Sequence, residues 1–192
     1  MQTLQTRTRW TIRDMSFCSL FAALIAAGAF MQITIPIQPF PMHFTLQWFF
    51  VLLAAFLLGH RLATYSVCIY LAIGLVGIPV FASGGGPSYL IRPTFGFLLG
   101  FALAAWVTGF VKNRLHSASF FAYLLSATAG LLVMYLSGML YFYMISNFVI
   151  FMPVTWKIVF INCCLITIGG DFVLCLLAAT LAKRLQDIMH YL

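Results

Sequence analysis

Acidic residues are almost absent from this sequence. Its 192 residues include three, Asp14, Asp171 and Asp187, and charged residues of both signs make up 7% of the chain. An ordinary soluble domain has about 25% charged residues, whereas 64% of this chain is hydrophobic. The composition excludes a soluble domain and predicts one integral membrane domain, residues 1–192, embedded in a lipid bilayer.

Motifs for nucleotides, metals and catalysis are also missing. There is no Walker A motif, so we expect no ATP hydrolysis by this chain. There is no HExxH motif, and the five cysteines lie in apolar runs without CxxC spacing, so we expect no metal site and no cofactor. Asp171 follows Ile168-Gly-Gly, which departs from the Gly-x-Gly of intramembrane aspartyl proteases, and no second acid shares its predicted depth. We therefore expect no catalytic residue; a membrane-embedded enzyme that uses Asp171 is the runner-up.

Long apolar runs fill most of the chain. A bilayer span takes about 20 residues, and the pattern predicts six helices, at 16–35, 46–58, 62–78, 94–111, 118–146 and 157–192. Pro36, Pro39 and Pro41 predict an irregular outer loop over 36–45, because proline cannot sit inside a regular helix. The last helix is expected to break at Gly169-Gly170. The predicted fold is an all-α integral membrane protein, a bundle of six transmembrane helices.

The basic residues predict the orientation of this bundle. Eight of the ten would share one side of the membrane: Arg7, Arg9, Arg13, Arg61, Lys112, Arg114, Lys183 and Arg184. Arg92 and Lys157 would lie on the other side. Cytoplasmic loops retain Lys and Arg, so both termini are expected inside. The net charge of +7 then reflects orientation, and we expect no nucleic-acid partner.

Asp171 is the first candidate for a ligand contact, because a carboxylate at membrane depth is costly unless it is used. Its position after two glycines fits a helix N-cap, which is the structural alternative. Interrupted helices in transporters also line ligand sites. There the carboxylate would accept hydrogen bonds from N–H groups of a ligand.

The predicted outer loop at 79–93 is the second candidate. Glycine permits close approach of the backbone to a ligand, and the flanking aromatic side chains can cover an apolar one. Its Arg92 would pair with an anionic ligand or with Asp171, unless it is an interfacial side chain that reaches for water. His43, in the preceding outer loop, would also face a ligand. The candidate residues of this irregular, Gly-rich loop are Phe81, Ser83, Gly84, Gly85, Gly86, Tyr89 and Arg92.

Small residues recur on the first predicted helix. Ala22 and Ala26 are four residues apart, and Ala23 and Ala27 give an equally good register. Such a stripe lets another helix approach closely, either within the protein or from a partner.

Several of these motifs together resemble the BioY family of biotin transporters. They are Leu58-Gly-His-Arg-Leu, Gly77-Ile-Pro-Val-Phe-Ala-Ser-Gly-Gly-Gly, Pro93-Thr-Phe-Gly-Phe-Leu-Leu-Gly-Phe, and Gly170-Asp171 in the last helix. The similarity extends from the first predicted span to the last.

The resemblance implies a function and partners. BioY proteins are S components, the substrate-capturing subunits of energy-coupling-factor (ECF) transporters, and bind biotin from outside. The chain would then lie in the cytoplasmic membrane of a prokaryote and act with a transmembrane coupling subunit and ATPase subunits. Ala22 and Ala26 would meet the coupling subunit. An S component for another small vitamin and a purely structural assembly subunit are the alternatives.

Two positions depart from the family pattern. The family has Asp-x-x-Lys at the start of the last helix, where this chain has Leu174 in place of lysine, and glycine before Pro-Thr, where this chain has Arg92. A relocated cation or a changed ligand would explain both differences. We expect biotin, because its ureido N–H groups suit a carboxylate and its bicyclic ring suits the aromatic, Gly-rich loop.

Overall fold

Helix α1 (Ile12–Phe30) opens the part of the chain that the computed structural model describes, residues 11–36 and 41–191, with side chains as far as residue 186. A capping box starts it: the Thr11 hydroxyl accepts a hydrogen bond from the Asp14 N–H, and the Asp14 carboxylate accepts one from the Thr11 N–H. These bonds satisfy N–H groups that a helix start leaves unpaired. Four residues used in the predictions lie outside this description: Arg7, Arg9, Pro39 and the side chain of Asp187.

A two-stranded hairpin follows α1 and corrects the all-α prediction. The helix ends at Phe30, and the apolar run continues to residue 35 as β1 (Gln32–Ile35). β2 (Met42–Thr45) pairs antiparallel with β1, and Ile33 lies opposite Phe44. β-Branched and aromatic residues favour extended backbone, and an apolar run by itself does not separate this strand from a longer helix.

Helix α2 (Gln47–Leu75) reverses direction in its middle. Gly59, where the sequence predicts the second span to end, has the non-helical angles φ 78° and ψ 171°. The Gln47 side-chain N–H donates to the Tyr70 hydroxyl at 2.7 Å. A straight helix would hold these residues, 23 positions apart, at about 35 Å from each other. The segments 47–58 and 60–75 therefore lie antiparallel.

The rest of the chain forms three long helical segments after a short 3-10 turn. The turn is η1 (Pro87–Ile91), and the first segment is α3 (Phe95–Leu115). The second consists of α4 (Phe120–Met144) and the π-helical turn η2 (Ile145–Val149). The third consists of α5 (Trp156–Phe160), the π-helical turn η3 (Ile161–Leu165) and α6 (Ile168–Tyr191). The predicted break at Gly169-Gly170 falls inside α6, so the interruption occurs earlier, directly before Ile168.

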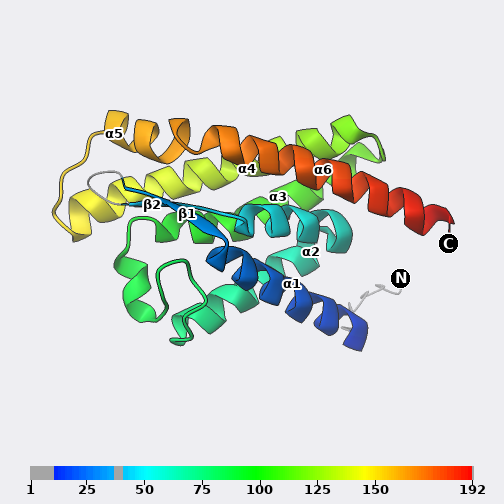
Figure 1. The fold of residues 1–192 in the computed structure, drawn as a ribbon, viewed down its shortest axis with the longest axis horizontal. Coiled ribbons are helices and arrows are strands. Elements are labelled where there is room, and N and C mark those ends of the chain that lie inside the picture. Colours follow the sequence, from blue (N-terminus) through cyan, green and yellow to red (C-terminus); the bar gives the residue numbers. More distant parts are fainter. Residues whose placement is uncertain (1–10, 37–40, 192) are drawn as a thin grey trace, which may run out of the picture.

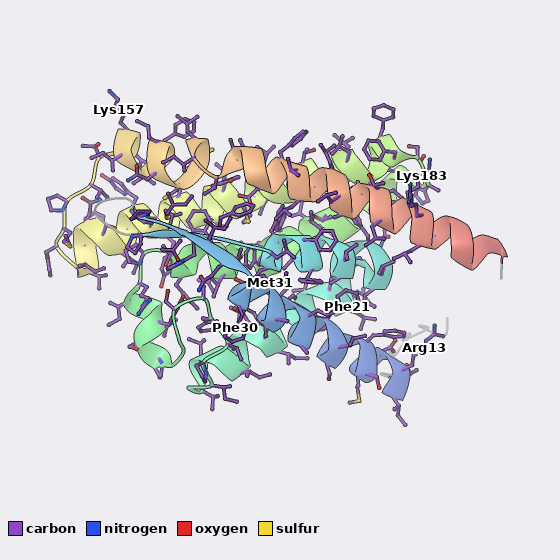
Figure 2. The ribbon with its side chains drawn as sticks, viewed as in Figure 1. Arg13, Phe21, Phe30, Met31, Lys157 and Lys183 are labelled. Carbon is purple, nitrogen blue, oxygen red and sulfur yellow. The ribbon has the colours of Figure 1, made fainter. Side chains whose placement is uncertain are left out.

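The helices pack largely in chain order. α1 packs against α2, α3 lies between α2 and α4, and α6 contacts α4 and α2. The start of α1 and the end of α6 lie at one end of the bundle, and α5 lies at the opposite end (Figure 1). Arg13 and Lys183 mark the first end and Lys157 the other (Figure 2). These three cations are thus separated along the bundle axis.

Five described helical segments are long and apolar enough to cross a membrane: Ile12–Phe30, Gln47–Leu75, Phe95–Leu115, Phe120–Val149 and Trp156–Gln186. The second is the one that reverses at Gly59. Their outward faces carry large apolar side chains, such as Leu132, Leu136 and Leu140 of α4. Such surfaces suit a lipid environment, so the fold is a multi-pass, predominantly helical membrane bundle.

Candidate ligand-binding site

A cavity lies where β2, the 79–93 loop and the helices meet. It holds about 650 Å³ of empty space, part of it open to solvent. Its wall is formed by Met42, His43, Phe44, Thr45, Gln47, Trp48, Ala82, Tyr89, Thr94, Phe97, Leu98, Phe101, Met134, Tyr135, Cys163, Thr167 and Asp171. The wall is mainly apolar and aromatic, with few polar groups, as is typical of sites for small organic ligands.

Asp171 supplies the single carboxylate of this wall. It is 8% exposed, and the Tyr135 hydroxyl donates to its Oδ2 at 2.5 Å. The Thr167 hydroxyl lies 2.8 Å from the same tyrosine oxygen. A carboxylate has about four lone-pair sites on its two oxygens, so the Tyr135 bond leaves acceptor capacity for a ligand.

The π-helical turn and the start of α6 set the position of this carboxylate. Cys163, Thr167 and Asp171 follow one another at four-residue spacing and all line the cavity. The Asp171 N–H donates to the Thr167 carbonyl at 3.0 Å. Since α6 begins at Ile168, Asp171 lies in its first turn, not at the N-cap. The predicted capping role is therefore corrected, and the carboxylate instead lies near the positive end of the helix dipole.

Aromatic side chains of α2 and α3 also line the cavity, and the sequence alone did not predict them. Trp48 stacks with Phe101 at a centroid distance of 6.0 Å, and its indole N–H donates to Cys175 Sγ at 3.3 Å. Phe97 contacts the Tyr135 ring edge-on. In a chain rich in phenylalanine, nothing in the local sequence distinguishes these rings from lipid-facing ones.

His43 joins the hairpin to the Gly-rich loop at the edge of the cavity. Its Nδ1 lies 3.1 Å from Thr34 Oγ1, and its Nε2 lies 2.9 Å from Ser83 Oγ. Burial, and to a smaller extent the charge of Arg92, lower the pKa of His43 below its ordinary value. The Gln32 side-chain N–H donates to the Ala82 carbonyl at 2.9 Å and makes a second connection. His43 thus lies in the wall of the cavity, and its contact with a ligand stays a prediction.

The aromatic residues of the loop separate into two roles. Tyr89 lines the cavity. Phe81 instead packs beneath the loop, against Tyr70, Tyr89 and Phe95. The Phe81 ring has room there because residue 74 is glycine: a Cβ at this position would lie 2.1 Å from the ring. Phe81 therefore supports the wall and does not line it.

The glycines of the loop shape its backbone. Gly84 and Gly86 have φ values of 113° and 100°, which side chains rarely allow. The Gly86 N–H donates to the Gly74 carbonyl at 2.8 Å, and a Cβ on Gly85 would lie 2.4 Å from the Ile78 carbonyl oxygen. These contacts fold the loop onto the end of α2. The residues that line the cavity come from either side of the glycines.

Arg92 lies outside this cavity. Its guanidinium carbon is 4.9 Å from the centroid of the Tyr89 ring, and its side chain lines a second cavity. Within the described residues it forms no ion pair, so the predicted partnership with Asp171 is absent. Leu174, at the family's lysine position, is buried in the core and also outside the cavity.

The small-residue stripe of α1 has one buried and one exposed register. Ala22 is 4% exposed and belongs to the core, and Ala26 is partly buried. Ala23 and Ala27 are exposed. The register that faces outward is thus Ala23 and Ala27, because Ala22 already packs within its own chain.

Metal ligands do not gather anywhere in residues 11–36 and 41–186. No group of three or more His, Cys, Asp or Glu side chains there is arranged to hold an ion. The polar chemistry of the cavity comes from its carboxylate, hydroxyl, amide and imidazole groups.

The fold and the cavity define the class: a multi-pass membrane protein with a small-ligand site between its helices. Comparison with known proteins gives the family. The sequence profile of the BioY family matches residues 2–191. The chain belongs to the BioY family.

Individual relatives cover most of the chain. It is 42% identical over 172 residues to a probable biotin transporter BioY of Lysinibacillus sphaericus, covering 90% of this chain and 86% of the relative. It is 36% identical over 175 residues to a probable biotin transporter BioY of Pyrococcus horikoshii, covering 91% and 96%. The crystal structure of an S component for biotin from an ECF-type ABC transporter superposes with a TM-score of 0.78 at 24% identity, over 92% of each chain. This last similarity concerns the fold.

Proposed function

We propose that this protein captures biotin in the Asp171 cavity and delivers it for uptake as the S component of an ECF-type transporter. The observation that carries the proposal is the hydrogen-bonded pair of Tyr135 and Asp171 in an aromatic cavity, in a chain whose relatives are named biotin transporters. The bacterial and archaeal sources of those relatives support a place in a prokaryotic cytoplasmic membrane.

The proposed binding mode follows from the chemistry of the wall. The Asp171 carboxylate accepts hydrogen bonds from the ureido N–H groups of biotin, and Tyr135 fixes its orientation. Such charge-assisted bonds are stronger than neutral ones. The bicyclic ring lies against Trp48 and Phe101, and the valerate chain extends outward past His43 toward Arg92.

Titration of the purified protein tests the proposal. Ligand that binds the folded state raises apparent stability, so biotin should raise the unfolding temperature more than any other member of a vitamin panel. A shift with a different vitamin and none with biotin would contradict the assignment. No change in the unfolding temperature with any vitamin would favour the alternative of a structural subunit.

We also propose that the bundle crosses the membrane six times with both termini inside. The reversal of α2 at Gly59 turns five helical segments into six passes, and the positions of Arg13, Lys183 and Lys157 support this orientation. In a background without the five native cysteines, cysteine introduced at Pro87 or Met152 should react with an impermeant reagent from outside. Cysteine at Lys112 should react after permeabilisation alone. External labelling at Lys112 would reverse the assignment.

A further prediction concerns Arg92, which we propose pairs with the carboxylate of biotin. Arg92→Gln should weaken biotin by about tenfold or more, the scale of a hydrogen bond to a charged group, and should change the affinity of a neutral biotin methylamide little. Lys157→Gln, which removes the other described outer cation, is the matched control and should leave both affinities unchanged. Equal losses for acid and amide in equilibrium titration would mean that Arg92 supports the Tyr89 ring and does not bind the ligand.

A further inference from the structure

A second cavity lies on the outer side of the binding site. It holds about 1080 Å³ of empty space, much of it open to solvent. Its polar lining comes from His43, Ser83, Ser88, Arg92 and Thr94, and Ile91 contributes apolar surface. The described helices and loops thus form two adjacent compartments, both partly open to solvent.

His43 and Thr94 connect the two compartments. Each of them lines both cavities, so together they form the shared wall. His43 is held there by its contacts with Thr34 and Ser83. A ligand that fills the inner cavity and extends its tail into the outer one would contact these two side chains.

Arg92 gives the outer cavity the means to bind an anion. Its guanidinium lies over the Tyr89 ring, is exposed, and has no acidic partner among the described residues. The hydroxyl groups of Ser83 and Ser88 add donors and acceptors to the same compartment. Guanidinium groups bind carboxylates through paired hydrogen bonds.

We propose that the site also accepts biotin extended at its carboxyl group by an amide, with biotinyl-lysine as the best-suited ligand. This inference rests on the proposed binding of biotin, with the ureido ring at Asp171. The valerate chain would pass His43 and Thr94, the amide would replace the free carboxylate in the outer cavity, and the aliphatic lysyl chain would fold against Ile91. The lysyl α-carboxylate would then meet Arg92, so that extension of the ligand keeps an ionic contact.

Biotinyl-lysine is also what complete proteolysis of a biotinylated protein releases, because biotin is attached to proteins through lysine side chains. The class of reaction that supplies this substrate is therefore peptide hydrolysis. The protein would recover the vitamin in its used, amide-linked form as well as in its free form.

Equilibrium titration of three ligands tests this proposal: biotin, biotinyl-lysine, and the pentylamide of biotin, which has the same spacer without the lysyl carboxylate and ammonium groups. Biotinyl-lysine should bind more tightly than the pentylamide, and Arg92→Gln should remove the difference. Ser88→Trp, which occupies space in the outer cavity, should weaken biotinyl-lysine by about tenfold or more beyond its effect on biotin, equivalent to about 1.4 kcal/mol. Leu90→Trp, on an exposed neighbour that lines neither cavity, is the matched control and should change neither affinity.

The outcomes separate the two proposals. Binding of biotin without binding of either amide would overturn the extended-ligand proposal and leave the biotin function intact. Equal effects of Ser88→Trp on biotin and biotinyl-lysine would also overturn it, because the outer cavity would then not be specific to the extension. Absence of biotin binding in the unmodified protein would overturn both.

Discussion

Replacing Asp171 by asparagine should weaken biotin binding by about ten- to hundredfold, because a hydrogen bond to a charged group contributes about 1.5–3 kcal/mol. The substitution keeps the size of the side chain and its ability to accept the Tyr135 bond, but removes the negative charge that faces the ureido group. Isothermal titration of the purified variant measures the change. The unfolding temperature without ligand should change little, since α6 begins at Ile168 and Asp171 does not cap it.

Asp14→Asn is the matched control for this experiment. Asp14 lies in the capping box of α1 and does not line the cavity, so the same chemical change there should leave the affinity for biotin unaltered. Unchanged affinity in Asp171→Asn would restrict Asp171 to a structural role. A loss of stability as large as the loss of affinity would point in the same direction.

Placing tryptophan at both Ala23 and Ala27 should abolish biotin uptake by cells and leave biotin binding intact. These residues form the exposed small-residue stripe of α1, and we propose that this stripe is where the transmembrane coupling subunit packs closely. Two indoles would keep that helix at a distance without entering the cavity. Radiolabelled uptake in cells with the coupling and ATPase subunits, together with titration of the purified variant, measures both properties.

Two positions on α2 provide the matched control for this double variant. Cys68 and Ala72 are also small, exposed and four residues apart, so Cys68→Trp with Ala72→Trp should leave uptake intact. Normal uptake by the α1 variant would place the partner contact elsewhere. Concentrative uptake into vesicles that contain this protein alone would contradict the inference, drawn from the missing Walker A motif, that energy comes from partner subunits.

Local sequence predicted the features that depend on neighbouring residues. Gly59-His60-Arg61 marked the reversal of α2, and the spans at 94–111 and 118–146 correspond to α3 and α4. The sequence predicted Asp171 as a site residue because a carboxylate within an apolar segment is unusual whatever its partners are. The hairpin was missed because Gln32-Ile-Thr-Ile35 continues the apolar run of α1 without a break.

The partners of the site residues could not be predicted in the same way. Tyr135 is 36 residues away from Asp171 and on another helix, and the contact exists through the packing of α4 against α6. The α1 stripe shows a related limit. Residues one position apart point about 100° apart on a helix, so Ala22/Ala26 and Ala23/Ala27 fit the spacing rule equally well. Only the position of α2 decides which pair is buried.

Trp48 gives the binding cavity an optical property. Its indole is 1% exposed and lines the cavity, whereas Trp106 and Trp156 are 46% and 51% exposed and line no part of it. A ligand that replaces solvent beside Trp48 changes the polarity around this indole, whereas Trp106 and Trp156 lie away from the cavity. Occupancy of the cavity thereby becomes visible in the ultraviolet emission of the unlabelled protein, and the fluorophore that reports it is itself part of the wall that holds the ligand.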